Sequence, residues 1–75
     1  MTAYAVKVGA VYGHPDYIRT IQASSPRQAI QQVVATMPSS EHGSTFMSCW
    51  IEDGGYVLDS GEIICDPNGT RFMPN

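Results

Sequence analysis

The first third of the chain alternates between apolar and polar positions. Every second residue from Tyr4 to Tyr12 is apolar or aromatic, while Lys7 and Gly9 occupy positions between them. A repeat of two residues is typical of a β-strand with one buried face. The segment 13–16, Gly-His-Pro-Asp, carries the residues that tight turns favour, and residues 17–23 form a second extended run. The two runs are therefore predicted to form a β-hairpin.

The next segment changes to the spacing of a helix. Ser25 can accept a hydrogen bond from a free backbone amide, Pro26 suits the first helical position, and Gln28 completes a capping box. Behind this start, apolar residues recur at intervals of three and four positions: Ile30, Val33, Val34 and Met37. Such a stripe predicts an amphipathic helix, and Pro38 ends it because the residue before a proline avoids the helical region.

Extended segments return after a polar loop over 39–45. Residues 46–52 and 56–58 are predicted as strands, joined by a tight turn over Asp53-Gly54-Gly55. Residues 59–61, Asp-Ser-Gly, leave two alternatives open. They form either a bulge within one long bent strand or a second turn before a separate strand over 62–65.

These elements predict an α+β fold with the chain order ββαββ. One helix covers one face of an antiparallel sheet of four or five strands, which makes a two-layer sandwich. A single domain is expected over residues 1–66. Residues 67–75, which begin with the turn sequence Pro-Asn-Gly, are expected to form a loosely held C-terminal tail.

The second face of the predicted sheet has no helix to cover it. Phe46 and Trp50 share one side of their strand, opposite to three apolar residues: Met47, Cys49 and Ile51. If those three lie under the helix, Phe46 and Trp50 lie on the open face; with the reverse parity, Trp50 belongs to the core. Exposed aromatic residues beside charge are typical of protein interfaces.

The charge of the chain is unevenly distributed. Among 75 residues, four are basic and seven acidic, which gives a net charge of −3. Residues 1–40 contain three basic residues and one acid, whereas residues 41–75 contain one basic residue and six acids. An acidic surface on the second half would attract a basic partner, although the same acids could serve solubility alone. The scattered basic residues argue against direct binding of nucleic acid.

No pattern of catalytic or metal-ligating residues is present in the sequence. Catalysis requires a nucleophile with a base, paired carboxylates or a metal site. His14 lies in a predicted turn and His42 in a polar loop, and the spacing of Cys49 and Cys65 matches no zinc motif. We therefore expect no enzymatic activity, no metal and no cofactor, and we expect both thiols to pack as small apolar groups.

The sequence also shows no run of about 18 apolar residues. Its first residues, Met-Thr-Ala-Tyr-Ala-Val-Lys, differ from a secretory signal, which begins with charge and continues with an apolar stretch. We therefore expect no contact with a membrane and a cytoplasmic location.

Residues 4–34 resemble short proteins encoded by phages and mobile elements. The resemblance rests on a hairpin that leads through Ala23, Ser25, Ala29 and Ile30 into one helix. It is closest to small inhibitors of the anti-CRISPR type, which are acidic and non-catalytic and place a helix on a sheet. The resemblance implies a stoichiometric inhibitor of a host defence complex that often acts at a nucleic-acid-binding surface. It assigns a role to no individual residue.

The leading hypothesis is a non-enzymatic inhibitor that binds a larger protein or complex with a basic surface, such as a CRISPR effector. Its candidate partner-binding residues lie in the acidic second half of the chain: Trp50, Glu52, Asp53, Tyr56, Asp59 and Glu62. The alternative is a small structural module that self-associates through its open sheet face or edge. The first hypothesis is compatible with a monomer, and the second requires at least a homodimer.

Overall fold

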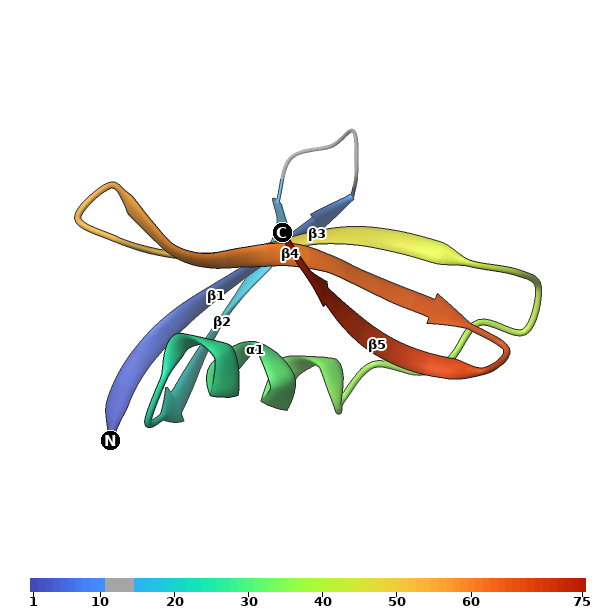
Figure 1. Cartoon of the computed structure of the whole chain (residues 1–75), viewed down its shortest axis with the longest axis horizontal. Helices are drawn as coiled ribbons and strands as arrows, with labels where there is room; N and C mark the ends of the chain where they lie inside the picture. The colour runs from blue at the N-terminus through green and yellow to red at the C-terminus, as the bar shows by residue number, and fades with distance from the viewer. Residues whose placement is uncertain (11–14) are drawn as a thin grey trace.

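The computed structural model describes residues 1–10 and 15–75, and it describes side chains for 1–9 and 17–75 (Figure 1). Its elements follow one another along the chain as β1 (Thr2–Ala10), β2 (Pro15–Ala23), α1 (Pro26–Val34), β3 (Thr45–Asp53), β4 (Tyr56–Asp66) and β5 (Gly69–Pro74). The predicted first turn, with His14, falls on residues that lie largely outside the described part.

The strands form one antiparallel sheet in the order β2-β1-β3-β4-β5, and α1 lies across one of its faces (Figure 1). For the described residues, the predicted α+β class with one antiparallel sheet and one helix is confirmed. The predicted chain order ββαββ is wrong, because the order is ββαβββ.

The fifth strand replaces the tail expected over residues 67–75. A two-residue turn pairs Asp66 with Gly69, and the φ of Gly69 is +125°, a conformation that favours glycine. The Asp66 carboxylate fixes this turn, because it accepts a hydrogen bond from the Asn68 amide at 2.9 Å and binds Arg71 at 2.7 Å. The expectation of a loosely held tail is therefore wrong for Gly69–Pro74.

The helix begins as predicted. Ser25 has extended backbone angles, and its hydroxyl accepts a hydrogen bond from the Gln28 amide at 3.2 Å. The side chain of Gln28 reaches back one residue further than a standard capping box, accepting from the Ser24 amide at 2.8 Å. At the other end, the regular helix stops at Val34. Met37 remains in a tighter final turn, in which its amide donates to the Val34 carbonyl at 3.1 Å.

The core lies between the helix and the sheet. The buried stripe of α1 consists of Ala29, Ile30 and Val33. It packs against fully or almost fully buried side chains from the three central strands: Val6, Val8, Cys49, Ile51 and Ile63. The side of β3 that carries Met47, Cys49 and Ile51 therefore faces the helix, as the first of the two alternatives predicted. In the part of the chain that the structure describes, no element covers the second face of the sheet.

The β3–β4 hairpin resolves the alternatives for residues 59–61. Gly54 and Gly55 have φ values of +58° and +89°, as a two-residue hairpin turn of the I′ type requires. Ile51 pairs with Asp59 and Glu52 with Val57, so Leu58 is an extra residue that forms a bulge. The bulge thus lies one residue before the predicted segment 59–61, whose three residues are all paired with β3. Residues 56–66 therefore form one strand. The tip of this hairpin lies at one end of the molecule, apart from the helix (Figure 1).

Candidate protein-binding face

The sheet face opposite α1, here called the open face, carries three rows of side chains. Strand pairing places Ile18, Lys7, Trp50 and Ser60 in one row, Ser48, Glu62 and Met73 in the next, and Phe46, Ile64 and Arg71 in the third. The neighbours of Trp50 in its own strand, Cys49 and Ile51, are each 1% exposed and belong to the core. Trp50 is therefore on the open face, and the alternative in which it belongs to the core is wrong.

Much of the open face is apolar and accessible. Ile18, Phe46 and Met73 are exposed by 58%, 45% and 49%, and Trp50 is half-buried. Ile64 is only 9% exposed, because Phe46 and Arg71 flank it on the neighbouring strands. Large apolar side chains grouped on one uncovered face are the kind of surface that protein interfaces use.

The charges on the open face are mostly paired. Lys7 forms an ion pair with Glu52 across β1 and β3, and Arg71 pairs with Asp66 at 2.7 Å across β4 and β5. In the described part of the chain, Glu62 forms no ion pair and is exposed. The open face thus presents one unpaired negative charge, next to Ser48 and Met73, among apolar side chains.

The six predicted partner-binding residues lie in three different places. Trp50, Glu52 and Glu62 are on the open face. Asp53 and Tyr56 are at the tip of the β3–β4 hairpin, where Tyr56 is 77% exposed. Asp59 is on the helix side of the sheet.

Asp59 is engaged within the chain. Its carboxylate accepts hydrogen bonds from Arg27 Nε at 2.7 Å and from Arg27 Nη2 at 3.1 Å. These bonds lower the pKa of Asp59, and the side chain is only 16% exposed. Asp59 therefore supports the packing of α1 on β4 rather than offering a free charge to a partner.

The acidic residues of the second half of the chain do not form the single surface that the sequence predicted. Of the six acids in residues 41–75, three are paired with basic residues: Glu52, Asp59 and Asp66. The other three are in a loop, at the hairpin tip and on the open face: Glu41, Asp53 and Glu62. Within the residues that the structure describes, the unpaired acids form no single patch.

Several exposed apolar residues were not among the predicted site residues. Ile18 and Met73 join the open face through β2 and β5, and β5 was expected to be a tail. At the hairpin tip, Val57 and Leu58 are exposed by 58% and 46% beside Tyr56. The run of three apolar residues after Gly55 is visible in the sequence, but the bulge that exposes all three depends on the pairing of β4 with β3.

Other chemistry is sparse in the described residues. No group of three or more histidine, cysteine or acidic side chains there could hold a metal ion. Cys49 and Cys65 are buried free thiols, and burial together with the charge of Asp59 raises the pKa of Cys49 to about 11. Among the described helices, none is long and apolar enough to cross a membrane.

Comparison with known proteins adds no further constraint on function. No known protein family matches the chain, and neither curated proteins nor solved structures show a significant match to it.

Proposed function

We propose that this protein is a non-enzymatic binding domain that docks a larger protein on its open face. The observation that supports the proposal is the uncovered sheet face itself, on which exposed Phe46 and Met73 lie near the unpaired Glu62. A fitting partner has an apolar patch with a Lys or Arg side chain that meets Glu62. Covering the apolar groups would supply the affinity, and the single charge would orient the complex.

The charges of the open face favour a protein over a nucleic acid. The two cations described on this face, Lys7 and Arg71, are already bound to carboxylates. Phosphate groups would have to compete with those carboxylates and would meet the negative charge of Glu62. Sheets that bind RNA combine aromatic residues with available basic side chains, and that combination does not occur among the described residues of this face.

The resemblance of residues 4–34 to small phage-encoded inhibitors adds a class of partner to the proposal. On this reading, the open face covers part of a basic surface on a host defence complex such as a CRISPR effector. The net charge of −3 and the unpaired Glu62 support it. Because three acids are committed to internal ion pairs, apolar contact supplies more of the affinity in this proposal than imitation of a nucleic acid does.

The test compares two charge reversals that change the net charge equally. Partners are first cross-linked to the protein in host extract and identified, and the binding of each purified partner is then measured. Glu62→Lys on the open face should weaken binding by at least about ten-fold. Glu41→Lys is the control, because Glu41 is also exposed and is unpaired in the described residues but lies in the α1–β3 loop.

A second pair of variants tests the apolar contact. Phe46→Ala removes an exposed ring from the open face, and Tyr56→Ala removes one from the hairpin tip. The proposal expects Phe46→Ala alone to weaken binding. Equal binding by wild type, Glu62→Lys and Phe46→Ala would refute the open face as the docking surface, and loss of binding in Tyr56→Ala alone would assign the contact to the hairpin tip.

Self-association is the second candidate, and the edge strand β2 favours it. This strand has nine residues, and among the described residues no strand pairs with its outer side. Its side chain Ile18 is 58% exposed. An uncovered edge of this kind can pair with a second copy. One hydrogen bond covers part of it, from Gln32 Nε2 to the Gln22 carbonyl at 3.2 Å. Light scattering across a hundred-fold range of concentration decides between the candidates, since a monomer throughout excludes assembly through β2.

A further inference from the structure

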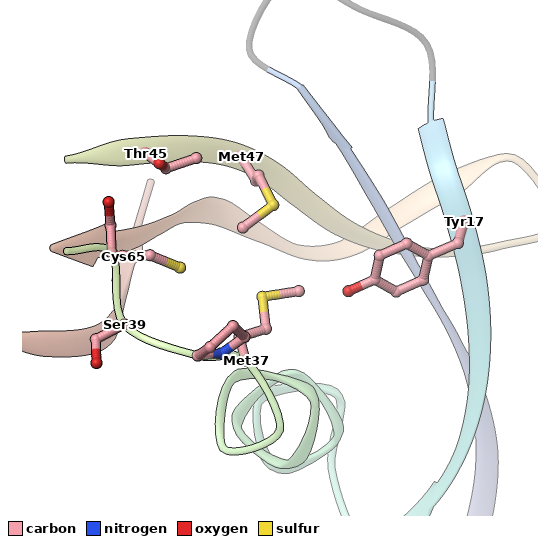
Figure 2. Close-up of a pocket in the computed structure, with 8 residues that line it drawn as sticks. Tyr17, Met37, Ser39, Thr45, Met47 and Cys65 are labelled. Carbon is pink, nitrogen blue, oxygen red and sulfur yellow. The ribbon is translucent and has the colours of Figure 1, made fainter. Parts of the chain in front are cut away.

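On the helix side of the sheet, a pocket of about 400 Å³ opens between the C-terminal end of α1 and strands β2, β3 and β4. Figure 2 shows Met37, Met47, the Tyr17 hydroxyl and the Cys65 thiol directed into the same space. Ser39 and Thr45 also line the pocket, from the loop after the helix and from the start of β3. The pocket is thus separate from the open face, which lies on the other side of the sheet.

We propose that this pocket binds a small uncharged molecule that contains an aromatic ring. Its volume falls within the range of small-molecule sites, which are mostly apolar with a few polar groups. Its polar side chains are hydroxyls and one thiol, and none of the side chains that the structure describes along its lining is charged. A charged ligand would lose its hydration there without gaining an ionic partner.

The sulfur atoms favour an aromatic ligand over a purely aliphatic one. Thioether sulfur makes favourable contacts with ring edges, and methionine adapts its shape to the molecule that it surrounds. Met37 and Met47 are both only half-buried, so their side chains remain accessible from the pocket. The ring of Tyr17 provides an aromatic wall beside them (Figure 2).

The wall formed by the end of α1 is held in place by β5. The Thr70 hydroxyl lies 3.2 Å from the Met37 carbonyl and 3.2 Å from the Pro38 carbonyl, so it can donate to either. The Met37 amide is also fixed, by its hydrogen bond to the Val34 carbonyl. A ligand would therefore enter a largely formed site and would not have to order this segment.

The chain contains its own control for a binding experiment. Of its four methionines, Met37 and Met47 line the pocket, whereas Met1 and Met73 are exposed by 95% and 49% outside it. With methionine methyl groups labelled with ¹³C, indole and p-cresol serve as uncharged aromatic probes, benzoate as a charged one and cyclohexanol as a non-aromatic one. Indole or p-cresol should shift the Met37 and Met47 signals to saturation and leave those of Met1 and Met73 unchanged.

The proposal expects benzoate and cyclohexanol to bind at least about ten-fold more weakly than the better uncharged aromatic probe. It is overturned if neither uncharged aromatic probe gives a saturable shift, or if Met73 shifts as much as Met47. Equal affinity for benzoate or for cyclohexanol overturns the assigned ligand class.

A pair of adjacent substitutions then tests the location. Thr45→Trp places a large ring at the mouth of the pocket and should weaken indole binding by at least about ten-fold. Phe46→Trp, its control, adds a similar ring on the opposite face and should leave binding unchanged. The fold of each variant is checked by its far-ultraviolet circular dichroism and by a cooperative thermal melt. If Thr45→Trp does not fold, Met47→Leu replaces it, because leucine retains the volume of methionine and lacks its sulfur. Unchanged indole binding by Met47→Leu would contradict the proposed role of the sulfur.

Discussion

Arg27 of α1 contacts Asp59 on β4 and Phe72 on β5, and so connects three elements of the fold. Its guanidinium donates two hydrogen bonds, of 2.7 and 3.1 Å, to the Asp59 carboxylate on β4. The central carbon of this guanidinium, Cζ, lies 5.3 Å from the centre of the Phe72 ring on β5. A cation over a ring face is attracted by it, so one side chain of α1 contacts both strands. The charge of Asp59 therefore serves the packing of the helix.

Replacing Asp59 with Asn should make the protein less stable at neutral pH, by a few degrees in Tm. In the wild type, the bond to Arg27 lowers the pKa of Asp59, so the ionised form stabilises the fold. This stabilisation is complete above the unfolded-state pKa of about 4 and is lost as the pH falls through the folded-state pKa. Thermal melts between pH 7 and pH 2 should show a smaller acid-induced fall in Tm for Asp59→Asn than for wild type.

Asp53→Asn is the matched control for this measurement. Asp53 lies on the same hairpin, is exposed, and forms no ion pair within the described chain. Its substitution should leave the Tm at neutral pH and the acid-induced fall close to those of wild type. Equal effects of the two substitutions would show that the Arg27 contact contributes no specific stabilisation.

Gly61→Ala should destabilise the fold by about 2 kcal/mol, which is typical of a substitution that adds an atom where the core has no space for it. A Cβ atom at this position would lie 2.4 Å from the Met73 carbonyl oxygen and 2.7 Å from a carbon of the Phe72 ring. The ring could turn aside, but the carbonyl belongs to the backbone of β5. Urea unfolding measures the change, and a double variant with Phe72→Ala should not restore stability, because the backbone contact remains.

Glu62→Ala, one residue further along β4, is the control for Gly61→Ala. Glu62 is exposed, so its truncation should change the free energy of unfolding by no more than about 0.5 kcal/mol. If Gly61→Ala were equally mild, the close approach of β5 to β4 could not be a constraint on this position.

The elements that could be predicted from the sequence are those set by local interactions. The helix is fixed by Ser25, Gln28 and its apolar stripe, all within about ten residues, and the hairpin turn is fixed by two consecutive glycines. In contrast, β5 has only six residues and includes Pro74, so its local pattern is weak. Its strand conformation results from pairing with β4 and from the packing of Phe72 over Gly61.

The same difference applies to the candidate site. The parity of β3 correctly offered Phe46 and Trp50 for the open face, because alternation is a local property. The ion pairs were not predictable in this way, since Lys7 and Glu52 are 45 positions apart and Arg27 and Asp59 are 32 positions apart. Counting the charges in each half of the chain assumes that Glu52 and Asp59 are unpaired. In the fold, Lys7 pairs with Glu52 and Arg27 pairs with Asp59.

The two glycines of the β3–β4 turn should differ in the substitutions that they tolerate. Gly54, at φ +58°, has the left-handed conformation that asparagine also adopts, whereas Gly55 lies at φ +89°. Gly54→Asn should therefore leave stability within about 0.5 kcal/mol of wild type, and the same substitution at the second position, Gly55→Asn, should reduce it by about 1 kcal/mol. Urea unfolding of both variants checks this, and equal costs would contradict a turn of the I′ type.

The two cysteines should differ in their reactivity toward alkylating reagents. Cys49 is 1% exposed, and its pKa is raised to about 11, mainly by burial and additionally by the charge of Asp59. At pH 8, only about one thousandth of it is then the reactive thiolate. Cys65 is 5% exposed and lines the pocket under the end of α1, so a small reagent can approach it without unfolding of the core.

Single-thiol variants measure each group separately. In the folded protein at pH 8, iodoacetamide should modify Cys65 in Cys49→Ala faster than it modifies Cys49 in Cys65→Ala, as followed by the mass of the intact chain. In denaturant, both thiols should react with iodoacetamide at similar rates. This result would show that the difference in rate in the folded protein is caused by the folded structure. Raising the pH from 8 to 10 should increase the rate at Cys49 in proportion to hydroxide, because the thiolate fraction keeps rising below a pKa of about 11. A rate at Cys49 that reaches a plateau near pH 9 would contradict the raised pKa.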